Sequence, residues 1–462
     1  MSKTITELLT ERAGENFELH EQHLNTQMVR VLKTIGYDRI YTKARGPYLY
    51  DEKGNEYLDL LSGFGVFAMG RNHPTIVQAL RDVLEAELPD MVQMDVSLLS
   101  GLLAEKILAR CPSNIKKMFF CNSGAEAVEA AIKFSRYTTR REKIVYCEHA
   151  FHGLTMGALS LNGEDIFREG FGPLLPHCVS VPFNDPDALE AALRNRDVAA
   201  FIVEPIQGKG VNLPSDDYLP EVARLCRQYG TLFVADEIQT GIGRTGKFWA
   251  IDHWGVEPDM ILMAKALSGG FIPVGAVAMT RQVMEAVFNR MDRAVVHGST
   301  FSKNNMAMAA GIAALDAIEE ENLVDNAAKT GGEIIDGLSA MIPRYDFFKE
   351  VRGKGLMIAL EFGSPSSLLR KSAWAGLEGA NKGLFSQTIT IPLFKNHRIL
   401  SQVAGHGMNV VKLLPPLVIG ARDRDWILTA LDEVIGGTQE VSGAIWDLGK
   451  NLISHAMKAK AG

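Results

Sequence analysis

Near the N-terminus, the spacing of apolar and polar positions predicts a helix followed by a hairpin. Over residues 15–35, apolar side chains recur at approximately helical intervals, which indicates one amphipathic helix. The stretch GPYLYDEKGNEYLDLLSG at residues 46–63 predicts two short strands around the turn Asp51-Glu52-Lys53-Gly54. We assign residues 1–70 to an N-terminal segment that forms part of a small domain.

Between residues 100 and 320 the pattern changes to short apolar runs that alternate with helical stretches. The runs that predict strands are KMFFC (117–121), KIVYC (143–147), CVSVPF (178–183), AAFIVEPI (199–206), TLFVADEI (231–238), MILMAKA (260–266) and GAVAMT (275–280). Helical stretches lie between several of them, at 124–136, 187–194 and 217–229. This alternation is typical of an α/β fold in which helices cover both faces of a mostly parallel sheet. We assign it to a large domain, residues 71–330.

After residue 330 the pattern changes again. It predicts a helix at 331–341, the strand LMIALEF at 356–362 and a last helix near 424–435. We assign residues 331–462 to a C-terminal small domain of α+β type, which the N-terminal segment completes. The least regular stretch is 363–386, which is rich in glycine and serine at its ends.

Composition excludes several classes of protein. The chain has 462 residues and a formal net charge of -7, so it lacks a broad basic surface for nucleic acid or an anionic membrane. No uninterrupted apolar run reaches the roughly 18 residues of a membrane span, and the N-terminus has no apolar signal-peptide region. The five cysteines are dispersed and form no CxxC pair, so neither a disulfide framework nor a metal site is indicated. We expect a cytoplasmic protein.

Chemistry is expected just beyond the strands, because ligands in open α/β sheets bind outside the carboxyl ends of the strands. After KMFFC, the turn Asn122-Ser123-Gly124 leads into a helix. Free N–H groups and the helix dipole at such a turn favour a phosphate. The alternative is a plain helix cap formed by Ser123 or Asn122.

After TLFVA, the acids Asp236 and Glu237 end an apolar strand. A carboxylate there can stabilise a cationic ring nitrogen or a metal ion, and the alternative is a helix cap or an ion pair. The same segment contains GIGRTG, a formal GxGxxG at 241–246. It lies well past the strand and no helical pattern follows, so it lacks the context of a dinucleotide fingerprint.

After MILMA comes Lys265, which by itself is explained by a side chain that extends to water. However, a phosphate cradle, an acid and a lysine at one sheet edge are together the set that pyridoxal phosphate needs. A lysine forms the Schiff base, and a carboxylate keeps the pyridine nitrogen protonated.

These residues lie in longer motifs by which the chain resembles class III pyridoxal-phosphate aminotransferases of fold type I. The motifs are FFCNSGAEAVEAAIK, AFHG, EPIQGKG, LFVADEIQTGIGRTGKFWA, PDMILMAKALSGGFIPVGA, VRGKGLM and LLPPLVI. The resemblance covers about residues 45 to 430. It is closest to the ω-aminotransferases of the putrescine and ornithine type, and the stretch SGFGVFAMG (62–70) resembles a segment typical of putrescine aminotransferases.

The resemblance implies roles for residues around the cofactor. Lys265 would form the Schiff base and shuttle the proton, and Asp236 would pair with the pyridine nitrogen. The other residues implied to hold the cofactor are Ser123, Gly124 and Ala125 at the phosphate, Phe151 and His152 on the ring face, Glu204, and Gln239 at the ring hydroxyl. Thr300 would reach the phosphate of a neighbouring subunit, which implies a homodimer; association of dimers into a tetramer is left open.

The substrate side departs from the family pattern. The loop after Thr300 reads TFSKNNMA where TFGGNPLA is common, and Lys412 stands where relatives place an arginine for a carboxylate. Lysine offers a point charge in place of a bidentate fork. Glu204 is expected to pair with Lys412 when a substrate without a carboxylate enters. Phe64 and Phe67 suggest an apolar pocket mouth and an amine donor with a lipophilic part, with putrescine as the competing choice.

The function we predict is ping-pong transfer of an amino group from an amine or ω-amino donor to a 2-oxo acid or aldehyde, with pyruvate or 2-oxoglutarate as the expected acceptor. One alternative is another reaction of the same cofactor, as in a racemase, decarboxylase or aminomutase. Two others are a nucleotide-binding oxidoreductase built on GIGRTG and a non-catalytic ligand-binding module.

Overall fold

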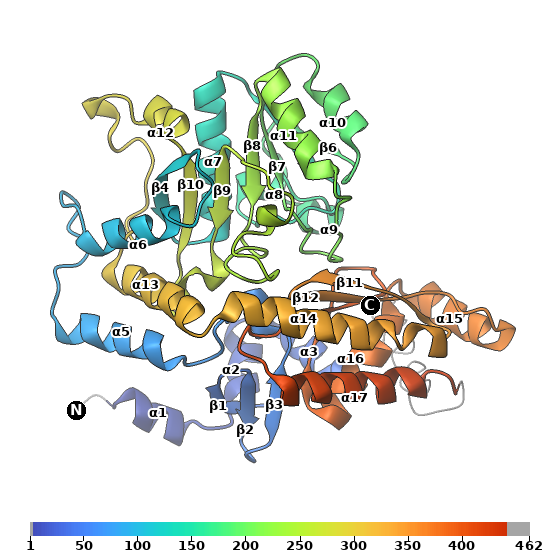
Figure 1. The fold of residues 1–462 in the computed structure, drawn as a ribbon. Helices are drawn as coiled ribbons and strands as arrows, with labels where there is room; N and C mark the ends of the chain where they lie inside the picture. Colours follow the sequence, from blue (N-terminus) through green and yellow to red (C-terminus); the bar gives the residue numbers. More distant parts are fainter. Residues whose placement is uncertain (1–2, 441–462) are drawn as a thin grey trace.

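A seven-stranded sheet forms the centre of the protein in the computed structural model, which describes residues 3–440 (Figure 1). Only β10 runs antiparallel to its neighbours among these strands; the other pairs are parallel. In spatial order the strands are β4 (Ile115–Cys121), β10 (Gly275–Thr280), β9 (Met260–Met263), β8 (Leu232–Asp236), β7 (Val198–Val203), β5 (Lys143–Cys147) and β6 (Cys178–Val181). The predicted α/β class is confirmed.

Helices pack against this sheet because its strands are apolar on both faces. Every residue of β7 and of β9 is buried, which is typical of the interior of a mostly parallel sheet. The helices of this part are α5 (Pro74–Glu85), α6 (Leu98–Leu108), α7 (Gly124–Thr139), α8 (Met156–Leu159), α9 (Asp165–Arg168), α10 (Pro186–Leu193), α11 (Tyr218–Tyr229), α12 (Arg281–Val287) and α13 (Asn305–Glu320). The long α7 packs against β7 and β9, and it begins just after β4 ends, so its N-terminus lies at the edge of the sheet where β4 ends.

Two smaller sheets lie below the central one in Figure 1. The first has the order β1-β2-β3-β13, and the second has the order β11-β12-β15-β14. Their strands are β1 (Tyr41–Arg45), β2 (Tyr48–Asp51), β3 (Glu56–Asp59), β11 (Phe348–Lys354), β12 (Met357–Phe362), β13 (Ile399–Leu400), β14 (Gln402–Val403) and β15 (Val410–Leu413). Because β13 pairs with β3, the N-terminal and C-terminal segments share one sheet, and the predicted hairpin is β2–β3.

Helices from both ends of the chain complete this part. They are α1 (Ile5–Glu11), α2 (Asn16–His23), α3 (Thr26–Ile35), α4 (Ser62–Gly65), α14 (Leu323–Ser339), α15 (Leu368–Ala380), α16 (Leu384–His397) and α17 (Ala421–Gly437). The boundaries at residues 70 and 330 stay predictions, and 441–462 of the predicted C-terminal unit lie outside the described residues. No helix within residues 3–440 is both long enough and apolar enough to cross a membrane.

Two predictions of local structure are wrong. The single helix expected over 15–35 is divided into α2 and α3, because the Asn25 side chain accepts hydrogen bonds from the N–H groups of Gln27 and Met28 and so caps α3. The stretch 363–386, expected to be irregular, contains α15 and the start of α16. There Trp374 stacks on Phe347 at 6.0 Å between ring centroids, so tertiary packing stabilises helix despite the glycines and serines at the ends.

Candidate active site

A cavity of about 940 Å³ lies beyond the ends of the central strands and extends to the small sheets. The central part of the chain contributes the turn at 122–125, Phe151, His152, Glu204, Lys209, Asp236, Gln239 and Lys265 to its lining. The segments that lie outside the central part contribute Phe64, Val66, residues 381–384, Gln387, residues 402–407 and Lys412. The predicted strand-end residues therefore converge on one site, although they are far apart in sequence.

Lys265 enters the cavity directly after β9. It begins a short 3₁₀ turn, Lys265–Ser268, with a φ of 40°, a strained backbone conformation for a residue with a side chain. Its ammonium nitrogen has no hydrogen-bond partner among residues 3–440. Burial lowers the pKa of Lys265, although the charges of Asp236 and Glu204 act in the opposite direction. The lysine is therefore kept closer to the neutral form that can act as nucleophile or base.

Asp236 ends β8 and lies against His152. The His152 Nδ1 donates a hydrogen bond of 2.6 Å to Asp236 Oδ2, and Asp236 Oδ1 accepts one from the Ile238 N–H at 3.0 Å. Burial alone would lower the pKa of His152, but the hydrogen bond and charge of Asp236 outweigh it and raise the pKa overall. The Nε2 of His152 is buried with no described partner. The sequence reasoning missed this pair, because no local pattern joins AFHG to the end of a distant strand.

The turn before α7 is a helix cap and also offers free N–H groups to an anion, so both interpretations of its sequence apply. Ser123 is the cap, since its hydroxyl accepts from the Glu126 N–H at 3.1 Å. Asn122 is held by Glu126 and by the Ser299 hydroxyl, to which its amide donates at 2.6 Å. The N–H groups of Gly124 and Ala125 have no partner within the described part of the chain. They line the cavity at the positive end of a long helix, so they are available for an anion.

Gly208 lies between Glu204 and Lys412. The Glu204 Oε2 accepts from the Gly208 N–H at 2.7 Å, and Lys412 Nζ donates to the Gly208 carbonyl at 2.7 Å. A Cβ at Gly208 would lie 2.7 Å from Gln239 Oε1 and 2.9 Å from Glu204 Oε2, so a side chain here would displace these two polar groups. Among the described residues Glu204 and Lys412 form no direct ion pair, since each is bonded to the backbone of this turn. Their pairing when a substrate without a carboxylate enters stays a prediction.

Gln239 and Phe64 complete the Lys412 side of the cavity. Gln239 Oε1 accepts from Lys412 at 3.3 Å, while its Nε2 donates to the Phe64 carbonyl at 3.0 Å. Phe64 lines the cavity and is 57% exposed. Phe67 does not line it: its ring packs under the Arg71 guanidinium at 4.0 Å and beside Gly270, where a Cβ would come within 2.5 Å. Thr300 is exposed outside the cavity.

Glu237, the acid that follows Asp236, points away from the cavity. Glu237 accepts hydrogen bonds from the Thr240 hydroxyl and from the Ile251 N–H, the latter at 2.8 Å, and it does not line the cavity. The GIGRTG segment is followed only by a four-residue 3₁₀ turn, and its Arg244 donates to the carbonyls of Leu356 and Pro415. This segment therefore packs the two parts of the protein together and lacks the helix of a dinucleotide site.

Further lining residues were not anticipated from the sequence, chiefly Lys209, Phe167, and β14 with the loop 404–407 that follows it. Lys209 directly follows the EPIQG motif, which was the available signal. No cluster of metal-ligating side chains is found within residues 3–440. The donor set fits pyridoxal phosphate: free N–H groups for the phosphate, a buried carboxylate for the ring nitrogen, and a lysine without a partner for the aldehyde.

Comparisons with known proteins agree with this arrangement. The family model described as Aminotransferase class-III matches residues 33–435. The curated protein "Aminotransferase PigE" of Serratia sp. (strain ATCC 39006) is 33% identical over 452 residues, which cover 91% of this chain and 53% of that protein. The chain thus spans about half the length of this relative.

Solved structures are similar over nearly the whole chain. The ornithine aminotransferase from Toxoplasma gondii ME49 superposes with a TM-score of 0.80 at 29% identity, covering 95% of this chain and 99% of that one. An amine transaminase from an uncultivated Pseudomonas species, in its pyridoxal-phosphate-bound form, gives a TM-score of 0.74 at 28% identity, covering 86% and 94%.

Proposed function

This chain belongs to the class III aminotransferases, and from that premise we propose that it moves an amino group from an amine or ω-amino donor to a 2-oxo acid or aldehyde by a ping-pong mechanism. The cofactor is pyridoxal phosphate, as in the family. The observation that carries the proposal is the convergence of Lys265, Asp236 and the free N–H groups of Gly124 and Ala125 on one cavity.

Each residue of the set has a separate task. When bound, the cofactor supplies an aldehyde that captures an amine and a ring that accepts electrons. Lys265 Nζ takes up the proton that leaves the substrate carbon bearing the amino group, and it delivers a proton in the reverse half-reaction. Asp236, oriented by His152, would hold a proton on the ring nitrogen. The N–H groups at the start of α7 bind the phosphate and fix the orientation of the ring.

The proposal is tested by supplying a donor without an acceptor. An aminotransferase forms one equivalent of carbonyl product and stops until a 2-oxo acid is added. A racemase, decarboxylase or aminomutase has no such stoichiometric stop. The donors to compare are alkyl amines of increasing length, putrescine and amino acids, because the mouth at Phe64 and Val66 supports a donor with a lipophilic part.

Lys412 is proposed to bind a substrate carboxylate, and this makes activity depend on pH. Burial lowers the pKa of Lys412 to about 7. The cation that attracts a carboxylate is present below this pKa and is lost as pH rises through it. We expect kcat/KM for a 2-oxo acid to fall above about pH 7, up to tenfold per pH unit at the limit. Lys412→Arg, which stays charged, is expected to remove this fall, and Lys412→Ala to lower kcat/KM most below pH 7.

The measurement is kcat/KM for the acceptor between pH 6 and pH 9 in the three proteins. If Lys412→Ala and Lys412→Arg both turn over glutamate and the 2-oxo acid like the wild type at every pH, Lys412 does not bind the carboxylate.

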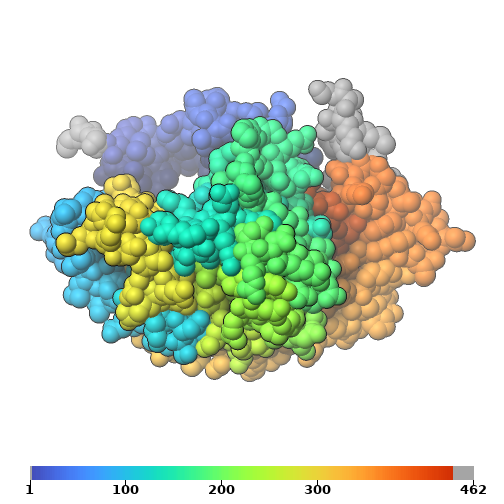
Figure 2. Space-filling view, turned by 90° about the horizontal axis from the view of Figure 1, so that it is seen from above, coloured from blue at the N-terminus to red at the C-terminus, as the bar shows by residue number. Residues whose placement is uncertain are grey.

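We also propose that the protein is a homodimer whose partner supplies Thr300. An apolar surface supports this proposal. It is formed by two stretches, residues 84–102 and residues 291–305, which Figure 2 shows side by side in blue-cyan and yellow. Asn305 joins them, donating to Asp90 at 2.8 Å and to the Pro89 carbonyl at 2.9 Å. The exposed apolar residues of this surface are Leu84, Leu88, Met91, Val92, Met94, Val96, Leu98, Leu102, Met291, Val295, Val296 and Phe301. A patch of this kind on a folded protein marks an interaction surface.

Charges on this surface are expected to separate the subunits. Met94 and Val96 are 96% and 91% exposed, so Met94→Glu with Val96→Glu leaves the fold intact. Burying two unpaired carboxylates at an interface would weaken the dimer at least about 100-fold. Sedimentation velocity is expected to show a dimer for the wild type and for the control Leu368→Glu with Leu369→Glu on α15, and a monomer for the first variant. A monomeric wild type would contradict the proposal.

The cytoplasmic location stays a prediction.

A further inference from the structure

We propose that Lys209 is a specificity residue that binds a carboxylate of the acceptor and disfavours donors carrying a second ammonium group. The inference rests on the proposed function. Lys209 is not one of the residues on which that function was argued, which are Lys265, Asp236, Gly124 and Ala125. Lys209 lies on the turn between β7 and α11, next to the Gly208 that Lys412 contacts.

Lys209 is a buried cation with no polar partner of its own. It is 8% exposed, lines the cavity, and its Nζ has no hydrogen-bond partner among the described residues. Lys412, by contrast, has its ammonium group on the Gly208 carbonyl and the Gln239 amide. A buried ammonium group with three unused donors is costly, so this site is satisfied only when an acceptor atom enters the cavity.

Two aromatic rings hold the ammonium group in place. The Nζ lies 4.0 Å from the centroid of the Phe167 ring and 5.4 Å from that of Phe151. The two rings meet edge to face with centroids 5.7 Å apart. Cation–π contacts stabilise the charge but use none of its hydrogen-bond donors. The rings also offer an apolar wall to the carbon chain of a substrate, so the site suits a carboxylate on an aliphatic chain.

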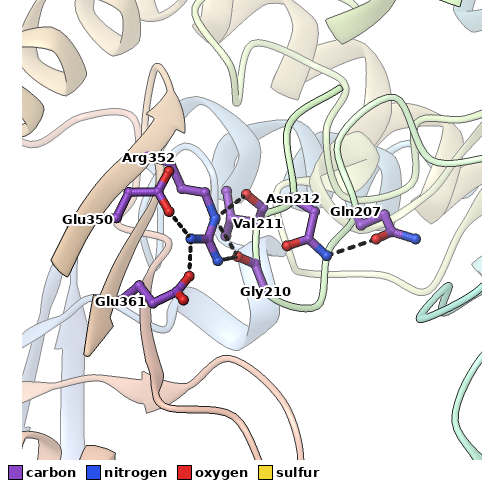
Figure 3. A network of polar contacts seen from close by, with 7 residues as sticks. All are labelled: Gln207, Gly210, Val211, Asn212, Glu350, Arg352 and Glu361. Atoms are coloured by element: carbon purple, nitrogen blue, oxygen red, sulfur yellow. Dashed lines mark hydrogen bonds and ion pairs between the residues drawn. The ribbon is translucent and has the colours of Figure 1, made fainter. Parts of the chain in front are cut away.

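The turn that carries Lys209 is fixed from the other side by Arg352 of β11 (Figure 3). Arg352 donates to the Gly210 carbonyl at 2.8 Å and to the Val211 carbonyl at 3.1 Å, and its charge is paired with Glu350 and Glu361. Within the turn, Asn212 donates to the Gln207 side chain at 2.8 Å.

This network holds the backbone in a strained form. Val211 has a φ of 52°, a conformation that a β-branched residue adopts only when its surroundings impose it. Arg352 is therefore a positioning residue: it fixes the turn, and the turn directs Lys209 into the cavity.

The charges of the whole cavity favour the same ligand. Besides Lys265, which burial keeps closer to the neutral form, three lysines line the cavity, Lys209, Lys382 and Lys412, against the two acids Glu204 and Asp236. A substrate carboxylate gains from this balance. A second ammonium group, as in a diamine, would meet Lys209 in a site of low dielectric and be repelled.

Binding to the holoenzyme tests the assignment without turnover. Isothermal titration calorimetry with glutarate, an unreactive dicarboxylate, is expected to show affinity about 10- to 100-fold weaker for Lys209→Met than for the wild type. Lys209→Arg is expected to restore most of it. Lys53→Met, at the exposed hairpin turn, changes the net charge equally and is expected to bind glutarate like the wild type.

Arg352 is tested by a double-mutant cycle. Arg352→Gln is expected to weaken glutarate binding in the wild type and to have little further effect in Lys209→Met, since it acts through that lysine. A merely structural role would lower affinity equally in both backgrounds.

Diamines give the converse test. The kcat/KM for 1,5-diaminopentane, relative to pentylamine, is expected to rise in Lys209→Met. Equal glutarate affinity in the wild type and Lys209→Met, or an unchanged diamine ratio, would overturn the inference even if the enzyme transaminates. Failure of the proposed function would appear differently, as no carbonyl product from any donor.

Discussion

Replacement of Lys265 by alanine is expected to reduce amino-group transfer by roughly 10⁴-fold, the upper end of the range for losing a positioned general base. The structure supplies the physical reason. Lys265 extends from a strained turn into the cavity, its pKa is lowered by burial, and it has no hydrogen-bond partner among residues 3–440. Of the other lysines of the cavity, Lys412 is bonded to the carbonyl of Gly208, and Lys209 lies against the rings of Phe167 and Phe151.

The measurement has two parts. Borohydride treatment of the holoenzyme followed by peptide mass spectrometry is expected to find the cofactor attached at Lys265 in the wild type and unattached in Lys265→Ala. A small primary amine such as methylamine is expected to restore part of the lost rate, because it replaces the missing base. Cofactor trapped at another lysine, or a variant with a tenth of wild-type activity, would rule out this role.

Asp236→Asn is expected to lower kcat by about 10²- to 10³-fold, the usual cost of removing one preorganised electrostatic group. The amide keeps the size of the side chain but loses the negative charge that would hold a proton on the cofactor ring. It also withdraws the charge that raises the pKa of His152, so this imidazole becomes easier to deprotonate. The loss should therefore appear in the chemical step and in the His152 titration, which NMR can follow.

The adjacent residue offers a matched control. Glu237 is also a buried acid at the end of β8, but its carboxylate faces Thr240 and Ile251, away from the cavity. Glu237→Gln is expected to change thermal stability with little change in kcat. Asp236→Asn is expected to lower kcat with little change in thermal stability. Equal kcat losses in the two variants would mean that Asp236 acts through stability alone.

Much of this site could be predicted because it lies at strand ends. An apolar run followed by a polar residue marks the end of a buried strand, and parallel strands end at the same edge of a sheet. Ser123, Asp236 and Lys265 could therefore be assigned to one place without coordinates. The motifs around them also identified the family, which the match over residues 33–435 confirms.

Other parts of the site followed no local pattern. Phe67 was expected at the pocket mouth but packs on Arg71, because glycines with positive φ around it reverse the chain. Glu204 and Lys412 are joined through Gly208, which no pattern in the sequence indicated, and their direct pairing with a bound substrate stays a prediction. The helices α15 and α16 were missed because Trp374 and Phe385 are held by Phe347, whose position is set by another segment.

The sequence by itself determined the fold class, the family and the residues proposed to act on the cofactor, since periodicity and strand ends are properties of short segments. Only the tertiary structure decided which way the loop side chains point. The directions of Lys209, His152 and Lys412 depend on contacts with Phe167, Asp236 and Gly208, which are distant in sequence. A loop has no repeating geometry from which such directions follow, so they are fixed by the packing and hydrogen bonds of the complete fold.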